Sequence, residues 1–209
     1  MNKNNKIVSL GFTNVNIPAG THICQIYSED DERNDSLLKY LLQGLISKEC
    51  NACFSDNITP GMLDEYLGKN GYSFHEVMKT GALSLNKTSD IYFKDGEFNP
   101  DQMLELLTGF YNSSIHSGFS AARVIGEMTP EVNHIKGGTR LLEYESRVSL
   151  LLKKCPVTAV CQYNAHSFDG ATIMDVLKVH PMMVVRGAVV HNPFFIAPEE
   201  YLKGTDYNA

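Results

Sequence analysis

One histidine and two cysteines on apolar segments are the residues best suited to metal chemistry. His22 and Cys24 lie two positions apart, so they share one face of the strand predicted over residues 22–27. Cys161 lies on a second apolar segment, residues 157–163. Imidazole and thiolate groups on neighbouring strands could hold a soft metal ion or a haem. Cysteine is also a common small core residue, and the sequence favours that second interpretation.

A second group of polar residues surrounds another apolar strand. Arg123 lies within the strand predicted over residues 121–126, and Glu127 follows it. A buried guanidinium needs a carboxylate partner, which we expect to be Glu127 or Glu145. Two interpretations stay open: an ion pair that ties a helix to the sheet, or a pocket whose polar groups orient a small ligand.

The remaining motifs give no positive support for enzymatic chemistry. Cys50 and Cys53 form a C-x-x-C pair, but no second pair of soft ligands accompanies it, and the pair enters a strand rather than opening a helix. We interpret both as small buried residues. The chain contains no Gly-x-Ser-x-Gly or His-Glu-x-x-His motif. We therefore expect neither a catalytic site nor a resident cofactor.

The segment after the first predicted strand is acidic. An α/β nucleotide enzyme would carry glycines and a lysine here to hold phosphate, whereas this chain has Ser28-Glu29-Asp30-Asp31-Glu32. We predict that Ser28 caps the following helix, with the acids favourably placed at the positive end of its dipole. The arrangement is that of a nucleotide-binding domain without its phosphate loop.

Strand-like and helix-like segments alternate along the chain. This alternation predicts an α/β three-layer sandwich with a mostly parallel central sheet. A hairpin that turns at Arg186-Gly187 is predicted to form an antiparallel edge near the C-terminus. The stretch 86–96 is polar and is predicted to be a loop. Ligands on such sheets bind beyond the carboxyl ends of the strands, where the sequence places Tyr27, Asp56, Glu127, Tyr163 and Asn164.

Composition excludes several classes of protein. The chain has 209 residues, of which 43% are hydrophobic and 20% charged, as in ordinary globular domains. The net charge of −6 argues against direct binding to nucleic acid. No signal peptide or membrane-spanning run is present, and five cysteines, an odd number, suit reduced thiols. We expect a soluble, cytoplasmic protein without membrane contact.

Nearly the whole chain, from about Gly20 to Leu202, resembles the MEDS domain, a sensory domain of methanogens and methylotrophs named after the DcmR regulator. The matching segments lie in a specific order at residues 22–27 (HICQIY), 95–98 (DGEF), 123–128 (RVIGEM), 144–145, 161–163 (CQY), 180–181, 192–195 (NPFF) and 198–201 (PEEY). The chain departs from the family pattern at Thr129-Pro130, where the family often has a tryptophan.

The resemblance implies a RecA/KaiC-like core whose phosphate loop has been lost, forming one domain over residues 1–209. It also implies small-molecule sensing in signal transduction or in transcriptional regulation of one-carbon and methyl-compound metabolism. We expect a stand-alone, non-enzymatic sensor that signals through a histidine kinase or a transcription regulator, and exposed edges would permit a homodimer. The expected ligand-binding residues are Tyr27, Arg123, Glu127, Tyr144, Glu145 and Tyr163.

Three alternatives remain. The first is a redox sensor that binds metal or haem through His22, Cys24 and Cys161. The second is an ATPase-like protein that still binds nucleotide. The third is a scaffold protein without a ligand.

Overall fold

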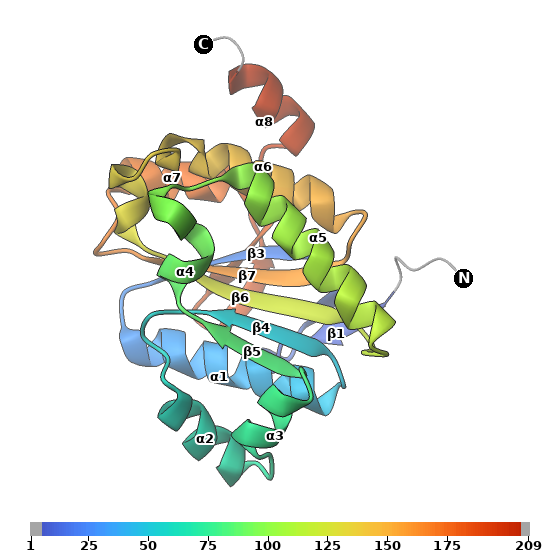
Figure 1. Ribbon diagram of the computed structural model, residues 1–209. Helices are drawn as coiled ribbons and strands as arrows, with labels where there is room; N and C mark the ends of the chain where they lie inside the picture. Colours follow the sequence, from blue (N-terminus) through green and yellow to red (C-terminus); the bar gives the residue numbers. More distant parts are fainter. Residues whose placement is uncertain (1–5, 206–209) are drawn as a thin grey trace.

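A seven-stranded sheet forms the centre of the protein (Figure 1). The computed structural model describes residues 6–205. The strand order is β5-β4-β6-β7-β3-β8-β9, and every neighbouring pair is parallel except β8 and β9. The strands are β3 (His22–Tyr27), β4 (Cys50–Phe54), β5 (Leu83–Asn86), β6 (Ala122–Met128), β7 (Val157–Asn164), β8 (Met182–Val185) and β9 (Ala188–His191). The predicted parallel sheet and C-terminal hairpin are confirmed.

Helices cover both faces of this sheet, which confirms the predicted three-layer sandwich (Figure 1). One layer contains α1 (Asp30–Ile46), α2 (Pro60–Lys69) and α3 (Phe74–Lys79). The other contains α5 (Pro100–His116), α6 (Leu141–Leu152) and α7 (Gly170–Val179). Successive residues of a strand face opposite layers, so an inner strand such as β6, with Val124 and Ile125, contributes to two separate apolar cores.

Local capping signals explain where several helices begin. Thr59 accepts a hydrogen bond from the backbone N–H of Met62, and proline follows at the first position of α2. Asn99 caps α5 in the same way. The prediction that Ser28 caps α1 is wrong, because the capping position is Glu29, whose side chain makes no capping bond. Acidic residues do occupy the first turn of α1, as predicted.

Short elements outside the main sheet were not predicted from the sequence. They are a hairpin of β1 (Ile7–Ser9) and β2 (Asn16–Pro18), the helices α3, α4 (Thr88–Tyr92) and α8 (Pro198–Thr205), and 3₁₀ turns at Lys94–Gly96, Pro130–His134 and Gly138–Arg140. The helix α4 lies in the stretch that we predicted to be a loop. Its buried Thr88 donates a hydrogen bond to the backbone oxygen of Glu127, a tertiary contact that local sequence patterns do not indicate.

None of the helices described within residues 6–205 combines the length and apolar character needed to cross a membrane.

Candidate functional site

Two buried polar clusters lie on opposite faces of the sheet. The first surrounds Glu127 at the carboxyl end of β6 and faces α1. The second surrounds Glu145 of α6 and contacts side chains of β3 and β7. Because residues two apart in a strand share a face, β6 directs Arg123 and Glu127 to the α1 side, away from α6.

The carboxylate of Glu127 is almost completely buried and accepts hydrogen bonds from four side chains. Its Oε1 atom accepts from the hydroxyl of Tyr27 at 2.8 Å and from the amide of Asn57 at 2.9 Å. Its Oε2 atom accepts from the hydroxyl of Ser55 at 2.9 Å and from the guanidinium of Arg33 at 3.3 Å. Burial, followed by the hydrogen bond to Glu127, raises the pKa of Tyr27, so its hydroxyl stays a donor at neutral pH.

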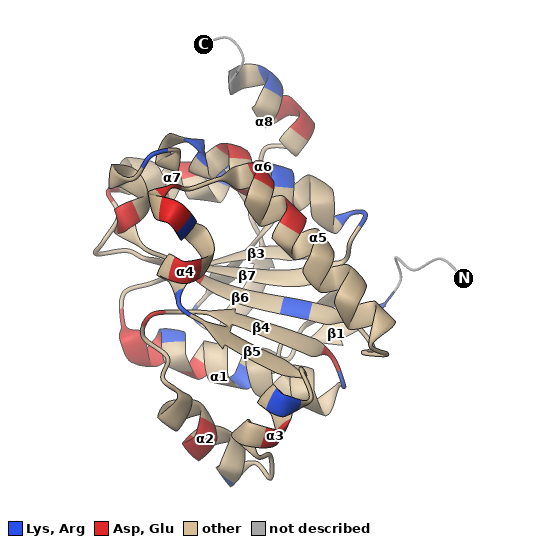
Figure 2. Ribbon diagram, in the orientation of Figure 1, with Lys and Arg blue, Asp and Glu red and all other residues tan. Residues whose placement is uncertain are grey.

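A cavity of about 510 Å³ opens above this carboxylate, at the carboxyl ends of the strands. Four of the side chains that line it are carboxylates, on Asp30, Asp56, Glu127 and Glu131. Burial and the nearby Glu127 raise the pKa of Asp56 above its ordinary value. Figure 2 shows the acidic residues gathered at the start of α1. Arg33 offsets part of this negative charge, because it pairs with Glu127 and lies 3.6 Å from Asp30. No basic side chain is among the described lining residues, so the remaining charge of the cavity wall favours a cation.

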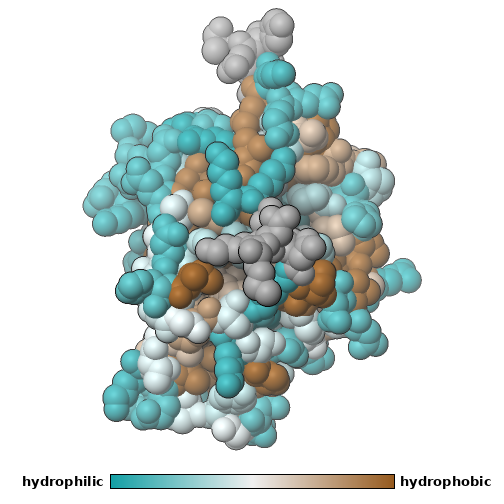
Figure 3. Space-filling view, turned by 90° about the vertical axis from the view of Figure 1, so that its right-hand side faces the viewer, coloured by the Kyte–Doolittle hydropathy of each residue, from teal (hydrophilic) through white to brown (hydrophobic). Residues whose placement is uncertain are grey.

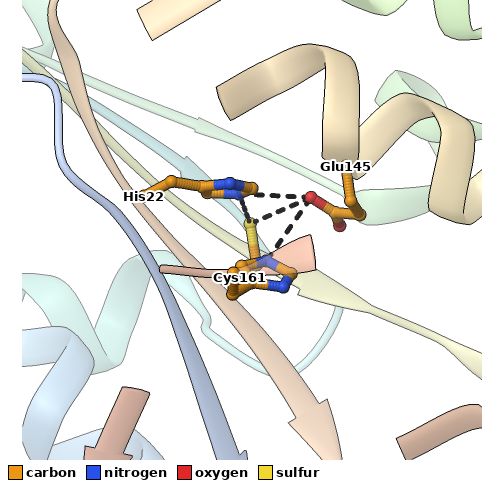
Figure 4. A group of neighbouring side chains, drawn as sticks. His22, Glu145 and Cys161 are labelled. Carbon is orange, nitrogen blue, oxygen red and sulfur yellow. Dashed lines mark hydrogen bonds and ion pairs between the residues drawn. The ribbon is translucent and has the colours of Figure 1, made fainter. Parts of the chain in front are cut away.

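The second cluster brings four metal-ligating side chains together. The Nε2 atom of His22 lies 3.2 Å from Oε2 of Glu145 and 3.3 Å from the sulfur of Cys161. The same carboxylate oxygen lies 3.5 Å from Nε2 of His180 and 3.7 Å from the Cys161 sulfur. Figure 4 shows His22, Glu145 and Cys161 pointing toward one another.

Burial sets the protonation of this cluster. It lowers the pKa of His22 to about 4, with a further contribution from His180. It also raises the pKa of the Cys161 thiol well above its ordinary value, and Glu145 adds to that effect. Burial alone would raise the pKa of Glu145, but the neighbouring imidazoles of His180 and His22 outweigh it and lower that pKa.

The structure divides the six predicted ligand-binding residues among separate places. Tyr27 and Glu127 meet at the strand-end cavity, as predicted. Glu145 and Tyr163 form a hydrogen bond in the second cluster. Tyr144 is buried in an aromatic group, with its ring centroid 5.5 Å from that of Phe98.

The expected pairing of Arg123 with Glu127 or Glu145 is wrong. Its Nε atom lies 2.7 Å from Oε2 of Glu49, and its other nitrogens donate to the backbone oxygens of Tyr40 and Ser9. Arg123 lies near the start of β6 and Glu127 near its end, so four residues of extended chain, roughly 13 Å, separate them. Figure 2 shows this basic residue within β6.

The metal alternative named His22, Cys161 and Cys24, and the structure places the first two among the four clustered ligand atoms. His22 and Cys161 are in contact, whereas the thiol of Cys24 donates a hydrogen bond to the backbone oxygen of Met182. Sequence reasoning did not include His180 among the candidate metal ligands. The available signal was that His180-Pro181 is one of the segments matching the family pattern.

The burial of the thiols leads to a prediction on their reactivity. Burial raises the pKa of Cys24 and Cys53 to about 12, whereas Cys155 is partly exposed after α6. Since the thiolate is the reactive form, we expect iodoacetamide to modify Cys155 roughly tenfold or more faster than Cys24 and Cys53 in native protein. Peptide mass spectrometry over time measures this ratio. Replacing Cys155 with serine should remove the fast phase, and equal rates at the three sites would contradict the prediction.

Comparison with known proteins assigns the chain to a family. A family model described as the MEthanogen/methylotroph, DcmR Sensory domain (MEDS) matches residues 21–181. The transcriptional repressor DcmR of Methylorubrum extorquens is 26% identical over 162 residues, which cover 76% of this chain and 57% of the repressor. The chain thus spans little more than half the length of that relative.

Two solved structures resemble the fold. The flagellar accessory protein FlaH from Methanocaldococcus jannaschii has a TM-score of 0.62 at 14% identity, covering 87% of this chain and 82% of its own. A KaiC-like protein from Pyrococcus horikoshii OT3 has a TM-score of 0.59 at 14% identity, covering 85% and 79%. These similarities show a RecA/KaiC-like fold. With the family model matching most of its length, the chain belongs to the MEDS family of sensory domains.

Proposed function

We propose that this protein is a non-enzymatic, cytoplasmic sensory domain that binds a small organic cation, such as a methylated amine, at the carboxyl ends of its strands. Membership of a sensory-domain family and similarity to a transcriptional repressor support a regulatory role. We further propose that one-carbon or methyl compounds are the signal, and that a histidine kinase or a transcription regulator receives it. The observation that carries the proposal is the buried carboxylate of Glu127 beside an acidic cavity.

The residues around the cavity suit a cation with methyl groups. Of the described residues that line it, none is lysine or arginine, and four are acidic. The rings of Tyr27 and Phe93 also line it and could contact methyl groups and the positive charge together. Asn57 and Tyr27 already hold the Glu127 carboxylate in place, so little rearrangement would accompany binding.

The same features argue against a nucleotide in this position. Only Ser28 and Glu29 separate β3 from α1, so no glycine-rich loop is present to cradle a phosphate. The carboxylates of Asp30 and Asp56 would repel a triphosphate. We therefore expect a calorimetric titration with ATP and magnesium to give no heat of binding.

Isothermal titration calorimetry with trimethylammonium tests the proposal, with the neutral tert-butanol as a ligand of similar shape. We expect the cation to bind and the alcohol to bind at least about tenfold more weakly, because only the cation gains the electrostatic attraction. Asp56→Asn, which changes an exposed wall residue, should weaken cation binding about tenfold. Glu127→Gln should weaken it further.

Glu32→Gln provides the matched control. Glu32 is an exposed acid of the same helix turn as Asp30, but it does not line the cavity. Its replacement should leave binding unchanged. Equal binding of cation and alcohol, or equal losses in Glu32→Gln and Asp56→Asn, would overturn the proposed ligand class. Preferential binding of dichloromethane or methanol would identify a neutral ligand instead.

A further inference from the structure

We propose that His22, Glu145, Cys161 and His180 form a binding site for one divalent first-row metal ion, with Zn²⁺ preferred. This site lies on the α6 face of the sheet, across from the proposed cation cavity. It goes beyond the proposed function and does not depend on it.

The spacing of the four donor atoms fits a single tetrahedral ion. All four lie within 4.8 Å of one another, and four of their six separations are 3.2, 3.3, 3.5 and 3.7 Å. With one sulfur among the ligands, zinc bond lengths imply edges of about 3.3 to 3.6 Å between the ligands of a tetrahedron. Two imidazoles, one thiolate and one carboxylate are all ligands that Zn²⁺ accepts in proteins. The donors lie too close together to flank a haem.

Contacts behind the donors orient both histidines toward the centre. The Nδ1 atom of His180 lies 2.8 Å from the backbone oxygen of Val176, which can only accept, so this nitrogen carries the proton. The hydroxyl of Ser149 donates to the backbone oxygen of Val179 and can therefore accept from Nδ1 of His22, at 2.9 Å. Both Nε2 atoms are left with lone pairs that face the cluster, as metal ligands require.

The carboxylate is held in a similar way. The hydroxyl of Tyr163 donates to Oε1 of Glu145, which leaves Oε2 directed at the two histidines and Cys161. Hydrogen bonds of this kind to the outer side of a ligand are typical of metal sites, where they fix ligand orientation.

A buried nitrogen without a hydrogen-bond partner supports a metal ion at this site. Nε2 of His180 is buried and makes no hydrogen bond, although it lies 3.5 Å from the Glu145 carboxylate. A lone pair and a carboxylate oxygen repel each other unless a proton or another cation lies between them. A metal ion would satisfy both atoms, and binding would release the proton of the Cys161 thiol to solvent as the sulfur–metal bond forms.

An entry route lies beside the cluster. His22 and Ser149 line a mainly apolar cavity of about 500 Å³ that extends to Pro181, Met182 and residues before α8. The face shown in Figure 3 carries apolar patches among hydrophilic side chains, one of them in the upper part of the view. Of the four ligands this cavity reaches His22, so it offers an approach to the site from that side.

Metal analysis and Co²⁺ substitution of the full chain test this proposal. Protein stripped with a chelator should take up one Zn²⁺ per chain, measured by elemental analysis after desalting. Co²⁺ should give the intense visible bands of a tetrahedral site and a thiolate-to-cobalt band in the near ultraviolet. A competition titration with a chromophoric chelator then gives the affinity for Zn²⁺.

Variants distinguish this site from adventitious binding. Cys161→Ser should remove the thiolate band, and His180→Gln should weaken Zn²⁺ binding about 100-fold or more. Tyr163→Phe should weaken it by roughly 10- to 100-fold through the lost contact with Glu145. Cys24→Ala is the matched control. Cys24 lies opposite Cys161 on the neighbouring strand, but its thiol donates a hydrogen bond to the backbone oxygen of Met182.

Three results would overturn the proposal. They are no zinc retained by the wild-type chain, a Co²⁺ spectrum without the thiolate band, and equal losses of affinity in Cys24→Ala and Cys161→Ser. The wild-type spectrum decides the matter even where a variant fails to fold. Loss of zinc binding with intact trimethylammonium binding would refute this site alone.

Discussion

Replacing Glu49 with alanine is expected to lower the free energy of unfolding by about 3 to 5 kcal/mol, because the change leaves a buried guanidinium without its counter-charge. Glu49 and Arg123 are both almost completely inaccessible to solvent, and Oε2 of Glu49 lies 2.5 Å from one terminal nitrogen of Arg123. The guanidinium also lies 4.6 Å from the centre of the Tyr40 ring. Urea denaturation followed by circular dichroism measures the loss.

A surface pair and a double replacement are the controls for this prediction. Glu65 and Lys69 form an exposed ion pair on α2, so Glu65→Ala should lower the stability far less than Glu49→Ala does. Glu49→Leu combined with Arg123→Met removes both charges and should recover much of the lost stability. Similar losses in Glu49→Ala and Glu65→Ala would show that the buried pair contributes far less than its burial implies.

The Arg123 pair also bears on function. Arg123 connects β6 to the β1–β2 hairpin through the backbone oxygen of Ser9, and it lies near the start of its strand, at the far end from the strand-end cavity. We therefore expect folded Glu49→Ala protein at low temperature to bind trimethylammonium with unchanged affinity. A ligand-binding role for Arg123 remains a prediction, which this measurement tests.

The layered fold could be predicted because its signals are local. Apolar strands that alternate with amphipathic helices indicate a parallel sheet covered on both faces. The hairpin followed from Arg186-Gly187, where both residues have the positive φ that a tight hairpin turn requires. The junction between β3 and α1 correctly indicated the absence of a phosphate loop, since no glycine lies in it.

The site could be predicted only for side chains that the ends of the parallel strands bring close together. Tyr27 is the last residue of β3 and Glu127 the second-last of β6, and both face the same layer. Topology therefore brings them to one edge of the sheet. The partner of Arg123 did not follow, because Glu49 comes after a helix and is typical in sequence of a solvated residue. Lys48 adopts a left-handed conformation with φ of 53°, and the chain then turns so that Glu49 is buried.

The metal-ligating cluster shows the same limit. His22 and Cys161 could be placed on neighbouring strands, but their partners come from a helix and from the turn after α7. Which face of α6 meets which strand depends on packing between elements far apart in sequence. Glu145 was therefore assigned to the cluster with Arg123, on the opposite face of the sheet.

Gly44→Ala is expected to lower the free energy of unfolding by about 1 to 3 kcal/mol. This loss should occur although alanine has a better helix propensity than glycine. Gly44 lies buried in α1, where a Cβ atom would overlap the side-chain oxygen of Asn51 and lie 2.8 Å from Cδ of Arg123. The Asn51 amide cannot turn away freely, because it donates to the backbone oxygens of Glu49 and Ala82.

Gly109→Ala is the matched substitution in a helix of the same length. Gly109 lies in the interior of α5, and a Cβ atom there would meet no other atom within 4 Å. Its replacement should raise stability by up to about 1 kcal/mol, since only the helix propensity changes. Opposite signs for the two variants in parallel urea titrations would show that contact with Asn51 determines the cost at Gly44.

A double variant identifies the atom responsible. Asn51→Ala removes the side-chain oxygen that a Cβ at position 44 would meet, although it also removes two hydrogen bonds to the backbone. If the overlap with Asn51 dominates, Gly44→Ala should cost less in the Asn51→Ala background than in the wild type, by about 0.5 to 3 kcal/mol. Additive losses would instead place the strain at Arg123, where the buried ion pair with Glu49 would then be displaced.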